Sequence, residues 1–195
     1  MAITPVELES LTTKSRFVTL VQKNNAGTYA IAGSDYPLIT ADINHVRLHE
    51  GRAFYAYKLQ PHATPLAAGS SINLAVAWAS GKTPHLVFDC NCGGDAEFYI
   101  YENAVVTGGT SFTAINRYRP SDNVSQSAVL INPTVTSVGN QLHAEMITGG
   151  TGKKAGGDSA FSFQHVLSPL TTYLFRLTNV NSTSHMAFLQ IAWYE

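Results

Sequence analysis

The chain has 195 residues and a formal net charge of -1, and only 13% of its residues are charged, whereas 45% are hydrophobic. Its Lys and Arg residues are scattered along the sequence, which argues against the basic face that nucleic-acid binding requires. No apolar run approaches the roughly 20 residues that cross a bilayer, so we expect no membrane partner. The first ten residues lack the features of a secretion signal, and we therefore expect synthesis in a cytoplasm.

Residues 1–44 show little periodicity and are expected to form an N-terminal arm or extension. Thr4, Pro5 and Glu7 follow the pattern of a capped helix start, which predicts a short helix over residues 5–13. An extra strand and loop of the main domain is the alternative. The apolar residues of this segment form a narrow stripe and are candidate contacts with a partner: Val6, Leu8 and Leu11.

Residues 45–195 alternate apolar and polar side chains, as half-buried strands do. The clearest strand is predicted for residues 70–79, where small residues separate four large apolar ones: Ile72, Leu74, Val76 and Trp78. Burying these four would contribute a gross ~6 to 12 kcal/mol. The small residues between them favour a second packed surface on the opposite face of the strand.

Two hairpins are predicted further along the chain. Gly93-Gly94 separates two alternating runs, which is typical of a hairpin turn. The last 26 residues are expected to form two strands joined by a polar loop at residues 179–184, and residues 107–125 to form a long loop. With about eight strands after His45 and no helix among them, the sequence predicts an all-β domain over residues 45–195. The expected architecture is a jelly-roll-like sandwich of two antiparallel sheets.

The sequence contains no P-loop, no G-x-S-x-G or H-E-x-x-H motif, and no array of four cysteine or histidine ligands. Cupin enzymes hold a metal with two histidines two residues apart, but His45 and His49 are four apart, with a turn or strand segment expected between them. Three other histidines lie on separate predicted strands and are expected to be ordinary half-exposed sheet residues, with convergence in the fold as the alternative: His85, His143 and His165. Cys90 and Cys92 are expected to be reduced, buried thiols, because a disulfide between such close neighbours would be strained. We therefore expect no enzymatic activity, metal or cofactor.

One predicted loop combines charge with an aromatic ring, and its residues are candidate interface contacts: Asn116, Arg117, Tyr118 and Arg119. Arg and Tyr are enriched at protein interfaces because they offer large contact areas and directed hydrogen bonds. The alternative is that the arginines pair with Glu97 or Glu102 on the neighbouring predicted hairpin. The sequence leaves both possibilities open.

Several segments together carry a resemblance to a known family: His45-Val46 and Glu50-Gly51 with Phe54, the Asn116-Arg117 loop, Pro133-Thr134-Val135-Thr136 with Gly139, the loop of residues 149–157, Thr172-Tyr173-Leu174 with Arg176-Leu177-Thr178-Asn179, and Trp193-Tyr194-Glu195. The chain resembles the capsid decoration, or cement, proteins of tailed bacteriophages. The resemblance covers residues 45–195.

The resemblance implies a jelly-roll protein on the outer surface of the virion capsid. Such a protein clamps neighbouring copies of the major capsid protein and stabilises the head against the pressure of packaged DNA. The implied partners are the major capsid protein and further copies of the chain, with a trimer favoured and a dimer possible. The alternative is the receptor- or glycan-binding head of a phage tail fibre or head fibre. Two tyrosine pairs would suit sugar stacking: Tyr55 with Tyr57, and Tyr99 with Tyr101.

Overall fold

The computed structural model describes residues 21–23, 29–31, 43–79, 81–149 and 164–195. The chain divides into two compact units, Met1–Asp42 and Ile43–Glu195. In the first unit, β1 (Val21–Lys23) and β2 (Tyr29–Ile31) form an antiparallel pair. The helix predicted for residues 5–13, with Val6, Leu8 and Leu11, lies outside the described residues.

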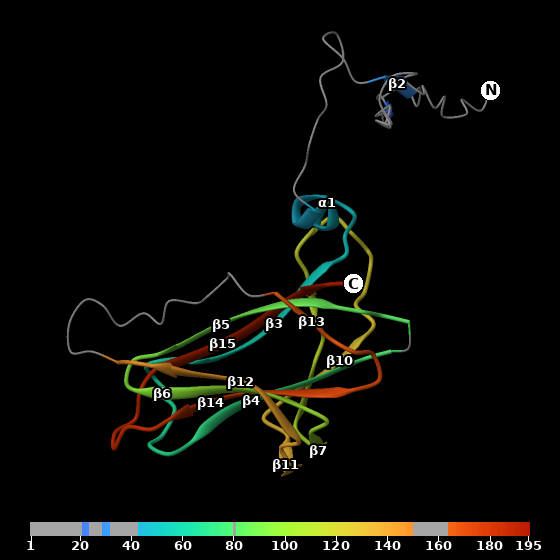
Figure 1. The fold of residues 1–195 in the computed structure, drawn as a ribbon. Coiled ribbons are helices and arrows are strands. Elements are labelled where there is room, and N and C mark those ends of the chain that lie inside the picture. Colours follow the sequence, from blue (N-terminus) through green and yellow to red (C-terminus); the bar gives the residue numbers. More distant parts are fainter. Residues whose placement is uncertain (1–20, 24–28, 32–42, 80, 150–163) are drawn as a thin grey trace, which may run out of the picture. The chain divides into compact units, whose positions relative to one another are not determined.

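The second unit is a sandwich of two antiparallel sheets (Figure 1). The order of the six-stranded sheet is β12 (Asn140–Ile147), β6 (Ala96–Glu102), β14 (Thr172–Asn179), β4 (Ser71–Trp78), β10 (Ser127–Ile131) and β8 (Thr110–Phe112). The order of the five-stranded sheet is β13 (His165–Val166), β5 (His85–Cys92), β15 (Ala187–Tyr194), β3 (Ala53–Gln60) and β9 (Ile115–Asn116). The predicted all-β, jelly-roll-like sandwich is confirmed.

The core lies between the two sheets and follows the predicted alternation. In β4, Ile72, Leu74, Val76 and Trp78 are all buried, as expected. Trp78 meets Trp193 of β15 edge to face, with ring centroids 5.6 Å apart, so the two sheets touch through their largest side chains. Cys90 and Cys92 are buried and unpaired in the same core, which confirms the expectation of reduced thiols.

The opposite face of the six-stranded sheet carries a smaller apolar cluster. There β7 (Val105–Thr107) and β11 (Thr134–Ser137) pair with each other and lie on the side of the sheet away from the core (Figure 1). Ala75 and Leu174 are buried in this cluster, with Val106 and Val135 packed against them. The small residues of β4 therefore do support a second packed surface, as the sequence indicates.

Both predicted hairpins are wrong. β5 and β6 flank Gly93-Gly94 but belong to different sheets, and so do the final two strands, β14 and β15. Each connection crosses the sandwich, and the two crossings brace one another: Gly93 N donates to Met186 O at 2.9 Å, and Val180 N donates to Asp95 O at 3.1 Å. Alternation reports which face of a strand is buried, but it does not report which strand lies beside it.

Local structure around the long loops also differs from the prediction. Residues expected to form a turn or strand segment form a helix, α1 (Ile43–His49), which brings the rings of His45 and His49 to 4.5 Å. The predicted loop of residues 107–125 contains the short strands β8 and β9. The described part of the second unit thus has thirteen strands, β3 to β15, rather than about eight. Elements of two or three residues are too short to show a period in the sequence.

Candidate functional site

One surface gathers segments that lie far apart in the sequence, and we call it the loop face. It consists of α1, residues 50–52, residues 116–126, Lys82 and Glu195. Asn116 connects two of these segments: its Nδ2 donates to Gly51 O at 2.8 Å and to Asn123 O at 3.0 Å. Its Oδ1 accepts a hydrogen bond from Tyr118 N at 2.9 Å. Both N–H donors of this buried amide, and one lone pair of its oxygen, are thus used within the chain.

Asn123 and Gly51 make further contacts between the loop of residues 116–126 and residues 50–52. Asn123 Nδ2 donates to Glu50 O at 3.1 Å and lies 3.3 Å from Gly51 O. Gly51 has a φ of +68°, and a Cβ there would collide with the Ser121 side chain, so only glycine fits this contact. Hydrogen bonds within the chain consequently tie the loop of residues 116–126 to residues 50–52.

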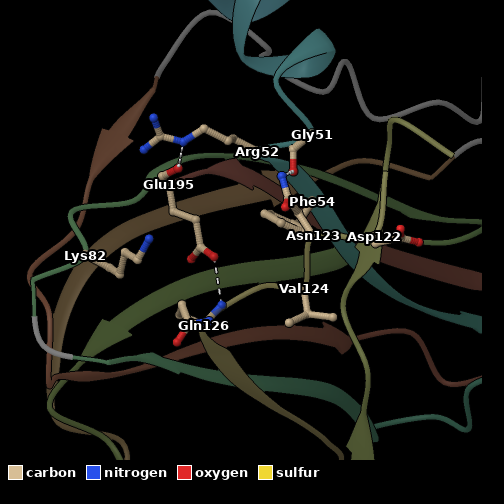
Figure 2. Close-up of a pocket in the computed structure, with 9 residues that line it drawn as sticks. All are labelled: Gly51, Arg52, Phe54, Lys82, Asp122, Asn123, Val124, Gln126 and Glu195. Carbon is tan, nitrogen blue, oxygen red and sulfur yellow. Dashed lines mark hydrogen bonds between the residues drawn. The ribbon is translucent and has the colours of Figure 1, made fainter. Parts of the chain in front are cut away.

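A pocket of about 480 Å³ opens beside this loop (Figure 2). Arg52, Glu195 and Lys82 lie along one side, and Asp122 and Val124 are on the loop across from them. Its other lining residues are Gly51, Phe54, Asn123 and Gln126.

Glu195 lines the pocket although it is only 9% exposed, which is unusual for a side chain that carries a charge. Arg52 Nε donates to Glu195 O at 2.6 Å, and Gln126 N donates to Glu195 Oε1 at 2.7 Å. Its other carboxylate oxygen, Oε2, is buried without a hydrogen-bond partner in the described residues. The carboxylate therefore anchors residue 126 to the sheet rather than facing solvent.

The four predicted interface residues differ in exposure: one is buried and bonded within the chain, and the other three reach the surface to different extents. Asn116 is the internal brace, whereas Arg117 and Arg119 are exposed and Tyr118 is half-buried beside His49, with ring centroids 5.8 Å apart. Arg119 Nη1 donates weakly to Asn116 O, at 3.4 Å. The alternative pairing with Glu97 or Glu102 is wrong: these carboxylates accept hydrogen bonds from Tyr99 OH at 2.9 Å and Tyr173 OH at 2.8 Å.

The two tyrosine pairs do not form one stripe. Tyr55 and Tyr57 stack at 6.1 Å on the outer face of the five-stranded sheet, and Tyr99 and Tyr101 stack at 5.7 Å on the outer face of the six-stranded sheet. The residues between them in sequence on each strand point into the core. A single aromatic platform for sugars is therefore not present at these four positions.

A histidine cluster lies where the edge strands of the two sheets meet. His143 of β12 and His165 of β13 have ring centroids 6.0 Å apart, and both pack on Phe88. The Nε2 atoms of both are buried without a hydrogen bond, although Glu145 Oε2 lies 3.6 Å from that of His143. His85, His143 and His165 are all half-exposed strand residues, as expected, and His143 and His165 also converge, which is the alternative that the sequence left open. Even so, no three His, Cys, Asp or Glu side chains among the described residues are placed to hold a metal ion.

The surroundings favour the neutral forms of two side chains here, His165 and Cys90. Burial, and secondarily the charge of His143, lower the pKa of His165 below its ordinary value of 6.5. Burial, reinforced by Glu145 and Asp89, raises the pKa of the Cys90 thiol to about 12. Cys90 therefore stays protonated at neutral pH, which makes it a poor nucleophile and a poor metal ligand.

The lowered pKa of His165 predicts a loss of stability in acid. The His165 side chain takes up a proton near pH 6.5 in the unfolded chain but only at lower pH in the folded chain. The contribution of neutral His165 to the free energy of unfolding is therefore fully present above about pH 6.5 and is lost as pH falls through the folded-state pKa. Urea unfolding at about pH 7.5 and about pH 5 should give a smaller pH-dependent loss for His165→Gln than for the unmodified chain. Equal losses in the two proteins would show that His165 does not contribute to the pH dependence.

Comparison with known proteins adds no relative. No protein-family model, curated protein or solved structure was found to match the chain. Within the described ranges, no helix is both long enough and apolar enough to cross a membrane.

Proposed function

We propose that the chain is a non-enzymatic structural protein of a phage virion. In this proposal it binds the outside of the mature capsid and clamps neighbouring major capsid subunits through its loop face. The observation that carries the proposal is the preorganised loop of residues 116–126, which presents Arg117, Tyr118 and Arg119 from a braced backbone. A rigid contact surface loses little conformational entropy on binding, which suits a permanent clamp.

The composition supports a protein that works by contact. Only 13% of the residues are charged, and a neutral polar surface is less costly to desolvate than a charged one. A symmetric oligomer that touches several capsid subunits would bind ~10² to 10⁴ times more tightly than a single footprint, if the geometry permits simultaneous contacts. Preference for the mature lattice over the immature one would stabilise the mature state by differential affinity.

The proposal is tested with mature heads of the encoding phage that lack this protein. Adding the purified chain should give co-sedimentation with the heads and should raise the temperature at which they release DNA. The matched control is bovine serum albumin at the same concentration. Failure of the chain to sediment with the heads would contradict the proposed function.

A second prediction concerns the N-terminal segment. Removing residues 1–13, which include Val6, Leu8 and Leu11, should weaken attachment to heads without changing the unfolding midpoint of the sandwich, because the sandwich unit begins at Ile43. Head binding and thermal unfolding of the truncated chain are the measurements. A large drop in the midpoint would instead place the segment in the folded core.

A further inference from the structure

The loop face gathers most of the positive charge of the sandwich unit. The described residues of Ile43–Glu195 include seven Lys or Arg side chains, and five belong to the loop face: Arg47, Arg52, Lys82, Arg117 and Arg119. The face has three carboxylates, whereas the rest of the described unit has five carboxylates and only two cations. The formal charge is therefore positive on the loop face and negative elsewhere, a separation hidden by the net charge of -1 for the chain.

Among the described residues, three of the five cations have no carboxylate partner. Arg47 Nη1 and Arg52 Nη1 lie 2.9 Å and 3.8 Å from the same oxygen of Glu50, so this carboxylate compensates part of their charge. No carboxylate of the described residues lies within ion-pair distance of Arg117, Arg119 or Lys82. Two of these three side chains, Arg117 and Arg119, are exposed.

The side-chain carboxylates of the face reduce this excess, but within the described residues none of them is paired with Arg117 or Arg119. Glu195 is buried and directs Oε1 to Gln126 N, as Figure 2 shows. Glu50 is already paired with the two arginines of residues 47–52. Asp122 is exposed, and no ion pair or side-chain hydrogen bond of its carboxylate is found within the described residues. An approaching surface consequently meets more positive than negative charge.

We infer that the loop face binds an acidic protein surface, with Arg117 and Arg119 paired to its carboxylates. The inference rests on the proposed function for the identity of that surface, which would belong to the major capsid protein. Guanidinium groups pair with carboxylates through two parallel hydrogen bonds, and charge complementarity of this kind fixes orientation and speeds association. Such pairing would clamp the same conformation that the Asn116 hydrogen bonds already hold.

The neighbouring side chains favour protein over nucleic acid as the occupant. Val124 is 72% exposed next to the charged loop, and Tyr118 lies half-buried between the two arginines. Mixed aromatic, apolar and arginine surfaces are typical of protein interfaces. Three unmatched cations would neutralise few phosphates, so the face would give only weak binding to DNA or RNA at physiological salt.

The test uses poly-L-glutamate as the acidic probe and a duplex DNA of about 20 base pairs as the competing probe, both at about 50 mM NaCl, where surface charges are weakly screened. The double variant Arg117→Gln, Arg119→Gln should bind poly-L-glutamate about tenfold more weakly than the unmodified chain. The matched control Lys58→Gln removes a cation outside the face and should change binding less than about twofold. No binding to poly-L-glutamate, an unaffected double variant, or tighter binding to the DNA would overturn the inference.

A parallel measurement with mature heads separates this inference from the proposed function. If the unmodified chain and the double variant bind heads equally tightly, the proposed function is retained and the inference is overturned. Binding to poly-L-glutamate that depends on Arg117 and Arg119, without binding to heads, would retain the acidic specificity and overturn the proposed function. Loss of head binding in the double variant, with an unchanged unfolding midpoint, is the result that supports both.

Discussion

Replacing Asn116 with alanine is expected to lower the free energy of unfolding by about 2 to 4 kcal/mol. The substitution leaves Gly51 O, Asn123 O and Tyr118 N without the partner that the Asn116 amide supplies. The hydrogen bond to Gly51 O is buried and the other two are part-buried, and backbone groups that lose a partner away from water retain a desolvation cost, which makes this loss larger than that of a surface contact. Urea unfolding at neutral pH measures it directly.

Two further variants make the interpretation specific. Asn140→Ala changes an exposed asparagine at the start of β12 and should stay within about 0.5 kcal/mol of the unmodified chain. Asn116→Asp keeps an acceptor for Tyr118 N but turns an anion toward the carbonyls of Gly51 and Asn123, so it should be at least as damaging as Asn116→Ala at neutral pH. An Asn116→Ala protein as stable as the Asn140→Ala control would contradict the bracing role.

Truncating Trp193 to alanine should cost about 3 to 5 kcal/mol, the largest effect expected from a single core substitution here. Trp193 is 3% exposed and packs on both Trp78 and Phe54, so its removal leaves a cavity where the two sheets meet. Trp193→Phe should cost less than half as much, because it keeps a ring. The Trp193 Nε1 donor has no partner in the described residues, so its loss breaks no hydrogen bond.

The matched control lies on the same strand but on the other face of the sheet. Phe188 is half-buried, and Phe188→Ala should cost clearly less than Trp193→Ala in the same urea titration. Equal costs for the two substitutions would contradict the assignment of the core to the space between the sheets. Proteins that unfold cooperatively in a single transition are needed for this comparison, which coincident fluorescence and circular dichroism curves would verify.

The sequence predicts the buried faces of the strands better than it predicts their neighbours. The alternation in β4 identifies Ile72, Leu74, Val76 and Trp78 as core residues, because burial follows the two-residue period of a strand. Gly93-Gly94 does mark a reversal of the chain, but a glycine pair is compatible both with a hairpin within one sheet and with a connection between two sheets. The choice depends on long-range packing, here on the contacts with residues 180–186.

The candidate site was harder to predict because its parts come from distant segments. Asn116 binds a carbonyl 65 residues away, and Arg52 binds one 143 residues away. The composition of the Asn116 to Arg119 loop makes it a candidate interface, with internal pairing of its arginines as the alternative, but nothing in the sequence joins Lys82 and Glu195 to it. His143 and His165 likewise meet only because the edge strands of the two sheets lie together.

Hydrogen–deuterium exchange of the chain bound to mature heads tests the central claim most directly, because it reports both binding and the surface used. Backbone amides of residues 116–126 should exchange more slowly on heads than in free protein, while amides of β6, which belongs to the six-stranded sheet away from the loop face, should be unchanged. Binding that leaves residues 116–126 unprotected and slows exchange elsewhere would contradict the account.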